Sequence, residues 1–250
     1  MIFKRAVARL RAQDWTAIAI ELTIVVVGVF IGTWVNDWRQ SEEERREIGR
    51  LLEQVRVECV ALMSTSEAFQ EYYATTSRNA HVALAAWNGD PKVSDRNFVI
   101  AAYQASQVAG LTGDSQALST VLGGEQVKKI DDPALRKAVA RVLQYDFSQV
   151  NPATMHTQYR DDVRETIPLS AQEKIRAACG DFYDKEGVLH LPASCNADLT
   201  PVEAREGAAA LRDRPELIRE LRLHQSAVST FLFALGRLES ELRDVERIDR

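Results

Sequence analysis

Apolar and small residues recur at alternating steps of three and four along two long stretches, one near each end of the chain. The first stretch covers residues 41–87, which contain no proline and one glycine, Gly49. Its stripe consists of Leu52, Val55, Cys59, Leu62, Ser66, Phe69, Tyr73, Thr76, Ala80, Ala83 and Trp87. This spacing is typical of a helix face packed on a nearly parallel neighbour, so it predicts one long helix.

The second stripe lies near the C-terminus and is unbroken. It consists of Leu217, Leu221, His224, Val228, Phe231, Leu235, Leu238, Leu242 and Val245. Two long striped helices with shorter helices between them indicate an antiparallel bundle. Packing within one chain is the simpler interpretation of both stripes, and an intermolecular coiled coil is the alternative.

Helix-ending signals divide the middle of the chain into shorter pieces. The sequence NGDP at residues 88–91 places glycine and proline where a helix ends. A second helix is predicted over residues 95–108, and glycines then break the chain into short pieces around residues 114–122.

Capping signals mark two later helices. Asp132 is suited to cap a helix that has Pro133 at its first position. Thr200 and Glu203 have the spacing of a capping box, and a short helix is predicted between these two, over residues 170–178. The predicted fold is therefore all-α, with an N-terminal transmembrane helix that continues into an antiparallel helical bundle.

The transmembrane prediction rests on the sequence AIAIELTIVVVGVFIGTWV at residues 17–35. This run is about long enough to cross a bilayer core of roughly 30 Å. Trp15 precedes it, while Trp34 and Trp38 close it, and tryptophan prefers the headgroup boundary. We therefore expect residues 17–38 to form a single membrane span.

Two other interpretations of this run are weaker. A cleaved signal peptide needs a site of small residues after its apolar core, and TWVNDW offers none. A buried helix of a soluble protein rarely carries so long a run of β-branched residues. An uncut single-pass anchor is the remaining interpretation.

Three cysteines bear on the compartment. Cys59 lies inside the first stripe, as a small apolar residue often does. Cys179 and Cys195 bracket GDFYDKEGVLHLPAS, which has no helical period, so we expect a disulfide that closes this loop. Two unrelated thiols are the alternative, and a metal site is disfavoured because only His190 lies nearby.

A disulfide persists only in an oxidising compartment. We therefore expect residues 39–250 to form a periplasmic bundle domain and residues 1–16, a basic arm, to stay in the cytoplasm. The Lys and Arg numbers near the two ends of the anchor are similar, so charge alone does not set this orientation.

Glu21 is a carboxylate within the apolar run. It shares one helical stripe with Gly28 and Gly32, and this G-x-x-x-G spacing allows close approach between membrane helices. One hypothesis places Glu21 in an interface between helices or in a narrow pore. In the other, Glu21 lies about 9 Å along the axis from Trp15, within reach of the headgroups, and pairs with Arg11 or a lipid.

The remaining candidates for chemistry are few. The net charge of −5 argues against nucleic-acid binding, and no fingerprint for a nucleotide, a metal or a cofactor is present. None of the four histidines has metal-ligand spacing. His224 lies in the second stripe, where a histidine acts either as a pH-sensitive group or as an ordinary buried residue with one hydrogen bond.

Two elements resemble a family of uncharacterised bacterial single-pass membrane proteins, a domain of unknown function. The first is ELTIVVVGVFIGTWVNDW at residues 21–38, in which an acid enters an apolar helix that ends in Asn and Trp. The second comprises AAYQASQVAG and VLGGEQVKKIDDPALRKAV, with Tyr103, Gly110, Ile130, Leu135 and Arg136. The resemblance covers roughly the first 150 residues. It implies a bacterial inner-membrane protein with a soluble helical domain, and it implies no activity.

These observations predict a non-enzymatic interaction or assembly role at the lipid bilayer. The expected partner is a second copy of the chain, giving a homo-oligomer, or another membrane protein. The alternatives are a ligand-sensing periplasmic domain that acts through a separate partner and a small channel-like oligomer. The basic arm is too short to be an output domain, which typically needs about 50 residues or more.

Overall fold

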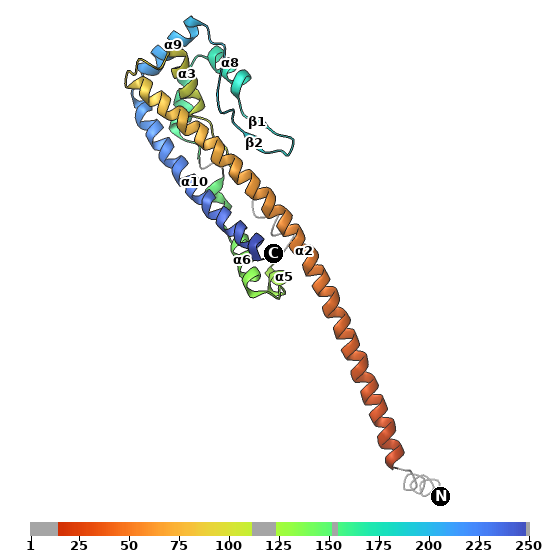
Figure 1. The fold of residues 1–250 in the computed structure, drawn as a ribbon. Helices are drawn as coiled ribbons and strands as arrows, with labels where there is room; N and C mark the ends of the chain where they lie inside the picture. The colour runs from red at the N-terminus through yellow and green to blue at the C-terminus, as the bar shows by residue number, and fades with distance from the viewer. Residues whose placement is uncertain (1–14, 112–123, 152–154, 249–250) are drawn as a thin grey trace, which may run out of the picture. The chain divides into compact units, whose positions relative to one another are not determined.

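The computed structural model describes residues 15–111, 124–151 and 155–248 (Figure 1). Its contacts divide the chain into two compact units, Met1–Leu52 and Glu53–Arg250. One helix, α2, spans Trp15–Trp87 and belongs to both units. The predicted all-α fold is confirmed, and so is the continuation of the apolar run into the first bundle helix.

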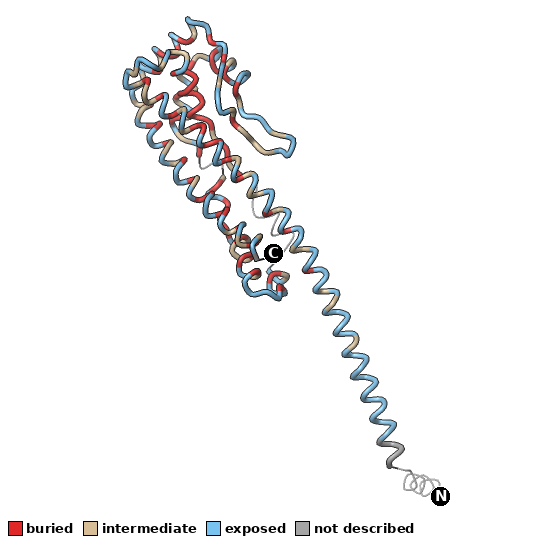
Figure 2. The backbone as a smooth tube through the Cα atoms, viewed as in Figure 1, coloured by how far each residue is buried: buried red, intermediate tan, exposed pale blue. Residues whose placement is uncertain are grey.

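The N-terminal part of α2 has the character of a membrane span. Among the described residues, α2 is the helix that is long and apolar enough to cross a bilayer, and no residue of its apolar window is buried (Figure 2). The hydroxyl of Thr33 donates back to the carbonyl oxygens of Val29 and Phe30, at 3.1 and 3.0 Å. The hydrogen-bonding group of this side chain is thus satisfied within the helix, as an apolar environment requires.

The second unit contains the C-terminal half of α2 and a series of shorter elements. Residues 147–150 form a 3-10 helix, η1. The other elements are α3 (Asp95–Gln104), α5 (Gly124–Lys128), α6 (Pro133–Leu143), α7 (Gln158–Thr166), α8 (Leu169–Cys179), β1 (Phe182–Tyr183), β2 (Leu189–His190), α9 (Pro201–Arg212) and α10 (Glu216–Ile248).

In this unit α2 and α10 run antiparallel, side by side (Figure 1). Ser66 of α2 donates to Glu239 of α10 at 2.7 Å, and eleven residues further along α2, Ser77 donates to Gln225 at 2.9 Å. Every residue of the second predicted stripe is buried. The stripes therefore pack inside one chain, which confirms the antiparallel bundle.

The predicted helix starts are also confirmed. Asp132 caps α6 by accepting from the amide of Ala134 at 2.7 Å, with Pro133 at the first helical position. Thr200 and Glu203 form the full capping box of α9. These local bonds satisfy amides that the first turn of a helix leaves without partners.

At one end of the unit, α3 packs tightly against α9. A Cβ built at Gly207 of α9 would lie 2.9 Å from Cγ2 of Val99, so the two backbones approach where a side chain would not fit. The indole of Trp87 donates to the carbonyl oxygen of Leu211 at 3.0 Å and meets the ring of Phe98 edge-on. The end of α2 is thereby fixed to both helices.

The prediction for the second helix was wrong at its C-terminal end. α3 ends at Gln104, and residues 105–111 are non-helical yet mostly buried. The helix stops because side chains from other elements bind the backbone of this segment, as described below. The short pieces predicted around residues 114–122 lie outside the described residues.

Candidate functional site

The buried non-helical segment, residues 105–111, lies where α2, α7 and α10 approach the end of α3. Irregular backbone inside a protein must find hydrogen-bond partners outside its own segment. Tyr73 of α2 supplies two, since its hydroxyl donates to the carbonyl oxygen of Ala109 and accepts from the amide of the same residue. The amide of Leu111 donates to the carbonyl oxygen of Val150 at 2.9 Å.

Helix α7 supplies further donors. The guanidinium of Arg160 donates to the carbonyl oxygen of Ser106 at 2.7 Å, and the hydroxyl of Tyr159 donates to that of Ala102 at 2.9 Å. The carbonyl oxygen of Ala102 in α3 and that of Ser106 just after it are thus satisfied without another helical turn, and the amides of Ser106 and Gln107 bond to the carbonyl oxygens of Tyr103 and Gln104. The early end of α3 follows from this arrangement.

A charged cluster lies beside the segment. Arg164 of α7 donates to Oε1 of Gln107 at 2.7 Å, and its guanidinium carbon lies 4.8 Å from the ring centroid of Tyr103. The hydroxyl of Tyr72 donates to Oδ2 of Asp181 at 3.1 Å. We call Tyr72, Tyr103, Arg160, Arg164, Arg176 and Asp181 the arginine cluster.

Burial dominates the electrostatics of the arginine cluster. It raises the pKa of Asp181, and the hydrogen bond from Tyr72 and the positive charges of Arg160 and Arg164 only partly oppose it. It lowers the pKa of Arg164, and the like charge of Arg160 adds to that effect. Burial also raises the pKa of Tyr72, which stays protonated and can only donate to the Asp181 carboxylate.

His224 lies on the other side of the segment and is fully buried. Its Nδ1 is 2.8 Å from the hydroxyl of Thr157, and its ring packs near that of Tyr159, with 5.7 Å between centroids. Burial, reinforced by the charge of Arg160, lowers the pKa of His224 to about 4. The histidine is therefore neutral at pH 7, and a pH-sensitive role stays a prediction that concerns acidic conditions.

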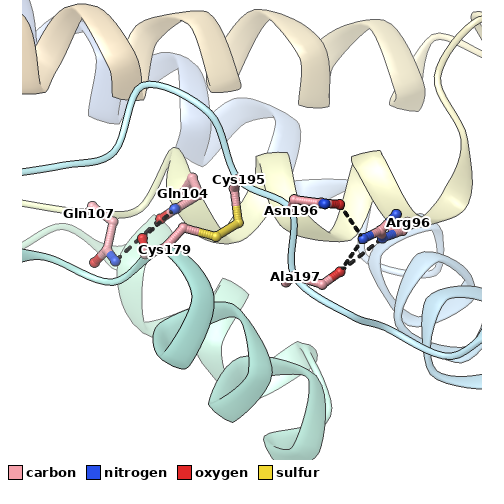
Figure 3. The surroundings of a disulfide bond; sticks show 7 residues. All are labelled: Arg96, Gln104, Gln107, Cys179, Cys195, Asn196 and Ala197. Atoms are coloured by element: carbon pink, nitrogen blue, oxygen red, sulfur yellow. Dashed lines mark hydrogen bonds between the residues drawn. A yellow bond between two sulfur atoms is a disulfide. The ribbon is translucent and has the colours of Figure 1, made fainter.

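The predicted disulfide between Cys179 and Cys195 is present, across a separation of 16 residues (Figure 3). Around it, the side-chain amide of Gln104 donates to the carbonyl oxygen of Cys179 at 2.8 Å, and the guanidinium of Arg96 donates to the carbonyl oxygen of Ala197. The disulfide and these bonds fix both ends of the β1–β2 hairpin to α3. Cys59 is the free cysteine of the described residues, and burial raises the pKa of its thiol to about 11.

The three anchor residues singled out by the sequence lie on the exposed part of α2. Glu21 is exposed, and a Cβ built at Gly28 or Gly32 would meet nothing within 4 Å. The structure therefore places these residues on one exposed stripe of α2. Their role in an interface stays a prediction.

An apolar groove of about 410 Å³ lies along α10. Its lining is Gln149, Met155, Ala227, Thr230, Phe231, Phe233 and Ala234. Phe233 is 71% exposed, and Leu223, which lies ten residues earlier on α10, is 64% exposed. Five of these seven side chains are apolar, so the groove offers a mainly apolar surface.

No group of three or more His, Cys, Asp or Glu side chains that could hold a metal ion occurs among the described residues. His190 pairs with Asp184 and His156 with Asp161, each on the surface of the bundle. We assign no reaction to either pair.

These features define a class: an all-α protein with one helix able to span a membrane and a disulfide-bonded helical bundle. Comparison with known protein families, curated proteins and solved structures finds no match. The resemblance to the uncharacterised bacterial family therefore stays a prediction.

The structure nevertheless gives the residues of that resemblance physical roles. Tyr103 and Gly110 belong to the end of α3 and the buried segment, and Ile130 is buried. Arg136 donates to the carbonyl oxygen of Ile130 at 3.1 Å, beside the Asp132 cap of α6. The described residues of this second element thus belong to a buried segment and to a helix start.

Proposed function

We propose that this chain is a membrane-anchored assembly module of a bacterial inner membrane. Residues 17–38 span the bilayer, the basic arm of residues 1–16 stays in the cytoplasm, and the bundle lies in the periplasm. The module catalyses no reaction and acts by self-association and by binding another membrane protein. The disulfide supports the periplasmic location, because such bonds persist in oxidising compartments.

The observation that supports an interaction role most is the apolar groove on α10. A pocket for a small polar ligand is expected to contain several convergent polar groups, whereas this groove offers Gln149 and Thr230 alone. Large exposed apolar side chains beside such a groove are typical of protein–protein contacts. Phe233 projects at its edge, so we assign the groove to a protein partner.

Self-association is assigned to the anchor stripe, the face of α2 that carries Glu21, Gly28 and Gly32. The open glycines allow a second helix to approach closely. A carboxylate in hydrocarbon costs at least a few kcal/mol, so Glu21 gains from facing a protein partner. If Glu21 instead pairs at the lipid headgroups, the two glycines alone promote association.

Cysteine crosslinking in native membranes tests self-association. In a Cys59→Ala background, Val25→Cys places a thiol on the anchor stripe, one turn from Gly28 and from Glu21, whereas Phe30→Cys places it on the opposite face. Both side chains are exposed in the single chain. We expect oxidation to produce a covalent dimer of the Val25→Cys protein and little or none of the Phe30→Cys protein.

Equal dimer yields from the two positions, or none from either, would contradict the proposal. Adding Gly32→Leu to the Val25→Cys protein should abolish the dimer if the glycines set the contact. A channel-like oligomer is distinguished by conductance in planar bilayers that Glu21→Gln removes. A photo-crosslinking residue at position 233 then identifies the protein bound at the groove.

A further inference from the structure

The arginine cluster contains three arginines and one carboxylate, and Arg160 and Arg164 are the two arginines that act on the carboxylate of Asp181. Arg160 and Arg164 are one turn apart on α7, and Arg176 lies on α8. Arg160, Arg176 and Asp181 are all close enough to act on the ionisation of Arg164. Three positive charges against one negative charge leave two positive charges unbalanced, in a chain whose net charge is −5.

Two hydrogen-bond donors of the cluster have no acceptor. The hydroxyl of Tyr103 and Nε of Arg164 are both buried, and neither has a hydrogen-bond partner in the part of the chain that the structure describes. Tyr103 is 0% exposed, and the Arg164 guanidinium lies over its ring. A buried donor without a partner costs free energy, and an acceptor that reached both groups would recover it.

The Asp181 carboxylate is held only weakly in this positive environment. Its side chain accepts from the hydroxyl of Tyr72 at 3.1 Å, and burial raises its pKa despite the neighbouring guanidiniums. The carboxylate is desolvated where it meets the buried Tyr72, but the residue as a whole is exposed and follows Gly180, where the chain leaves α8. Another anion can therefore compete for its place without unfolding a helix.

We propose that the arginine cluster binds a small oxyanion, a carboxylate or a phosphate, which takes the place of the Asp181 side chain beside Arg160 and Arg164 and accepts from the hydroxyl of Tyr103. The planar fork of a guanidinium matches the oxygens of both ligand types, and a charge-assisted hydrogen bond is stronger than a neutral one. This site is separate from the proposed assembly contacts on the anchor and in the groove.

The test uses the full chain purified in a neutral detergent, with inorganic phosphate and acetate as probes. The unfolding midpoint is followed as each probe replaces chloride at constant ionic strength, because a ligand that binds the folded state raises the midpoint. We expect the wild-type midpoint to rise with probe concentration. Arg164→Gln should weaken the apparent affinity at least about tenfold, whereas Arg247→Gln, which removes an exposed arginine of α10, should leave it unchanged.

Asp181→Asn is the most informative variant, since it removes the competing charge. It should tighten apparent probe binding by about tenfold, a gain that misfolding cannot imitate. Arg164→Lys, which keeps the charge but loses the fork, should fall between the wild type and Arg164→Gln. Equal responses of Arg164→Gln and Arg247→Gln, or no gain in Asp181→Asn, would overturn the proposal.

Lipid nanodiscs separate the two sources of a phosphate group. A rise in midpoint with free phosphate in neutral detergent assigns a soluble anion. A rise only in nanodiscs that contain phosphatidylglycerol, compared with nanodiscs of phosphatidylcholine, assigns a lipid headgroup, provided that Arg164→Gln removes it. Indifference to phosphate, acetate and phosphatidylglycerol alike rules the site out.

Discussion

The hydroxyl of Ser66 on α2 donates a 2.7 Å hydrogen bond to the buried carboxylate of Glu239 on α10, 173 residues further along the chain. Gln70 donates to the same oxygen, and Arg243 lies 3.4 Å from the other one. A charge removed from water must be matched by donors or an opposite charge. This pair therefore fixes how the two long helices align within the bundle.

Removing one donor should be costly at this point. We expect Ser66→Ala to lower the free energy of unfolding by about 1–3 kcal/mol, because it leaves a buried carboxylate oxygen short of a partner. Thr65→Ala is the matched control, since the exposed Thr65 hydroxyl only bonds within its own helix, to Ala61. Urea unfolding of both variants checks the expectation, and equal losses would contradict it.

Replacing glycine by alanine should have opposite effects on stability at two positions. Gly207→Ala places a Cβ against Val99 between α9 and α3, so we expect a loss of about 1–3 kcal/mol in the free energy of unfolding. Gly236→Ala in α10 meets nothing within 4 Å and should gain about 0.5–1 kcal/mol from higher helix propensity. Thermal unfolding gives both signs, and a stabilised Gly207→Ala protein would refute the tight α3–α9 contact.

His224 makes the stability of the bundle sensitive to acid. Its pKa in the folded chain, about 4, lies below the ordinary value of 6.5, so the unfolded chain binds the proton first as pH falls. The stabilisation is present above pH 6.5 and is lost progressively down to about pH 4, by about 3 kcal/mol in total. Urea unfolding at a series of pH values measures this loss.

Two substitutions separate His224 from other titrating groups. His224→Gln should flatten the decline in stability between pH 6.5 and about 4, whereas His81→Gln, at an exposed position, should keep it. Parallel curves for His224→Gln and the wild type would show that this imidazole does not account for the acid sensitivity.

The disulfide should contribute measurably to stability. Closing a loop of this length stabilises by about 3 kcal/mol in the chain-entropy model. We expect the Cys179→Ser/Cys195→Ser double variant to lose about that amount in urea unfolding. Dithiothreitol should destabilise the wild type to a similar extent and leave the double variant unchanged; a wild type indifferent to reduction would mean that the bond adds little.

The long helices and their caps could be predicted because local signals determine them. The two stripes have the period of a packed helix, and the Asp132 and Thr200 caps form bonds with residues two or three positions away. The disulfide could be predicted because its cysteines bracket the long irregular loop. The stripes and the caps depend on residues that are close in the sequence. The disulfide joins two cysteines that have few alternative partners.

The end of α3 and the arginine cluster could not be predicted in this way. The sequence after Gln104 is compatible with a helix. The helix ends there because Tyr73 and Arg160, from distant elements, bind the backbone of the segment that follows. Arg164 and Asp181 resemble ordinary surface charges until folding brings them together. The one available signal was Arg160 and Arg164 one turn apart, which is too common to indicate a site.

The apolar run of α2 and the groove on α10 also differ in how far the sequence predicts them. The apolar run predicted directly that the N-terminal part of α2 is long and apolar enough to span a membrane, since that property depends on length and composition and not on long-range contacts. The groove on α10 depends on η1 and on which face of α10 the rest of the bundle leaves uncovered. Phe233 lies just outside the buried stripe, and the stripe alone does not show that a hollow forms beside it.

The central claim is that the N-terminal part of α2 crosses lipid uncut and holds an oxidised bundle on the periplasmic side. The most direct measurement fuses two reporters in turn after Arg250: a phosphatase active only in the periplasm and a fluorescent protein that folds only in the cytosol. We predict phosphatase activity in the membrane fraction and no fluorescence. Fluorescence without phosphatase activity, or phosphatase released in soluble form, would contradict the account.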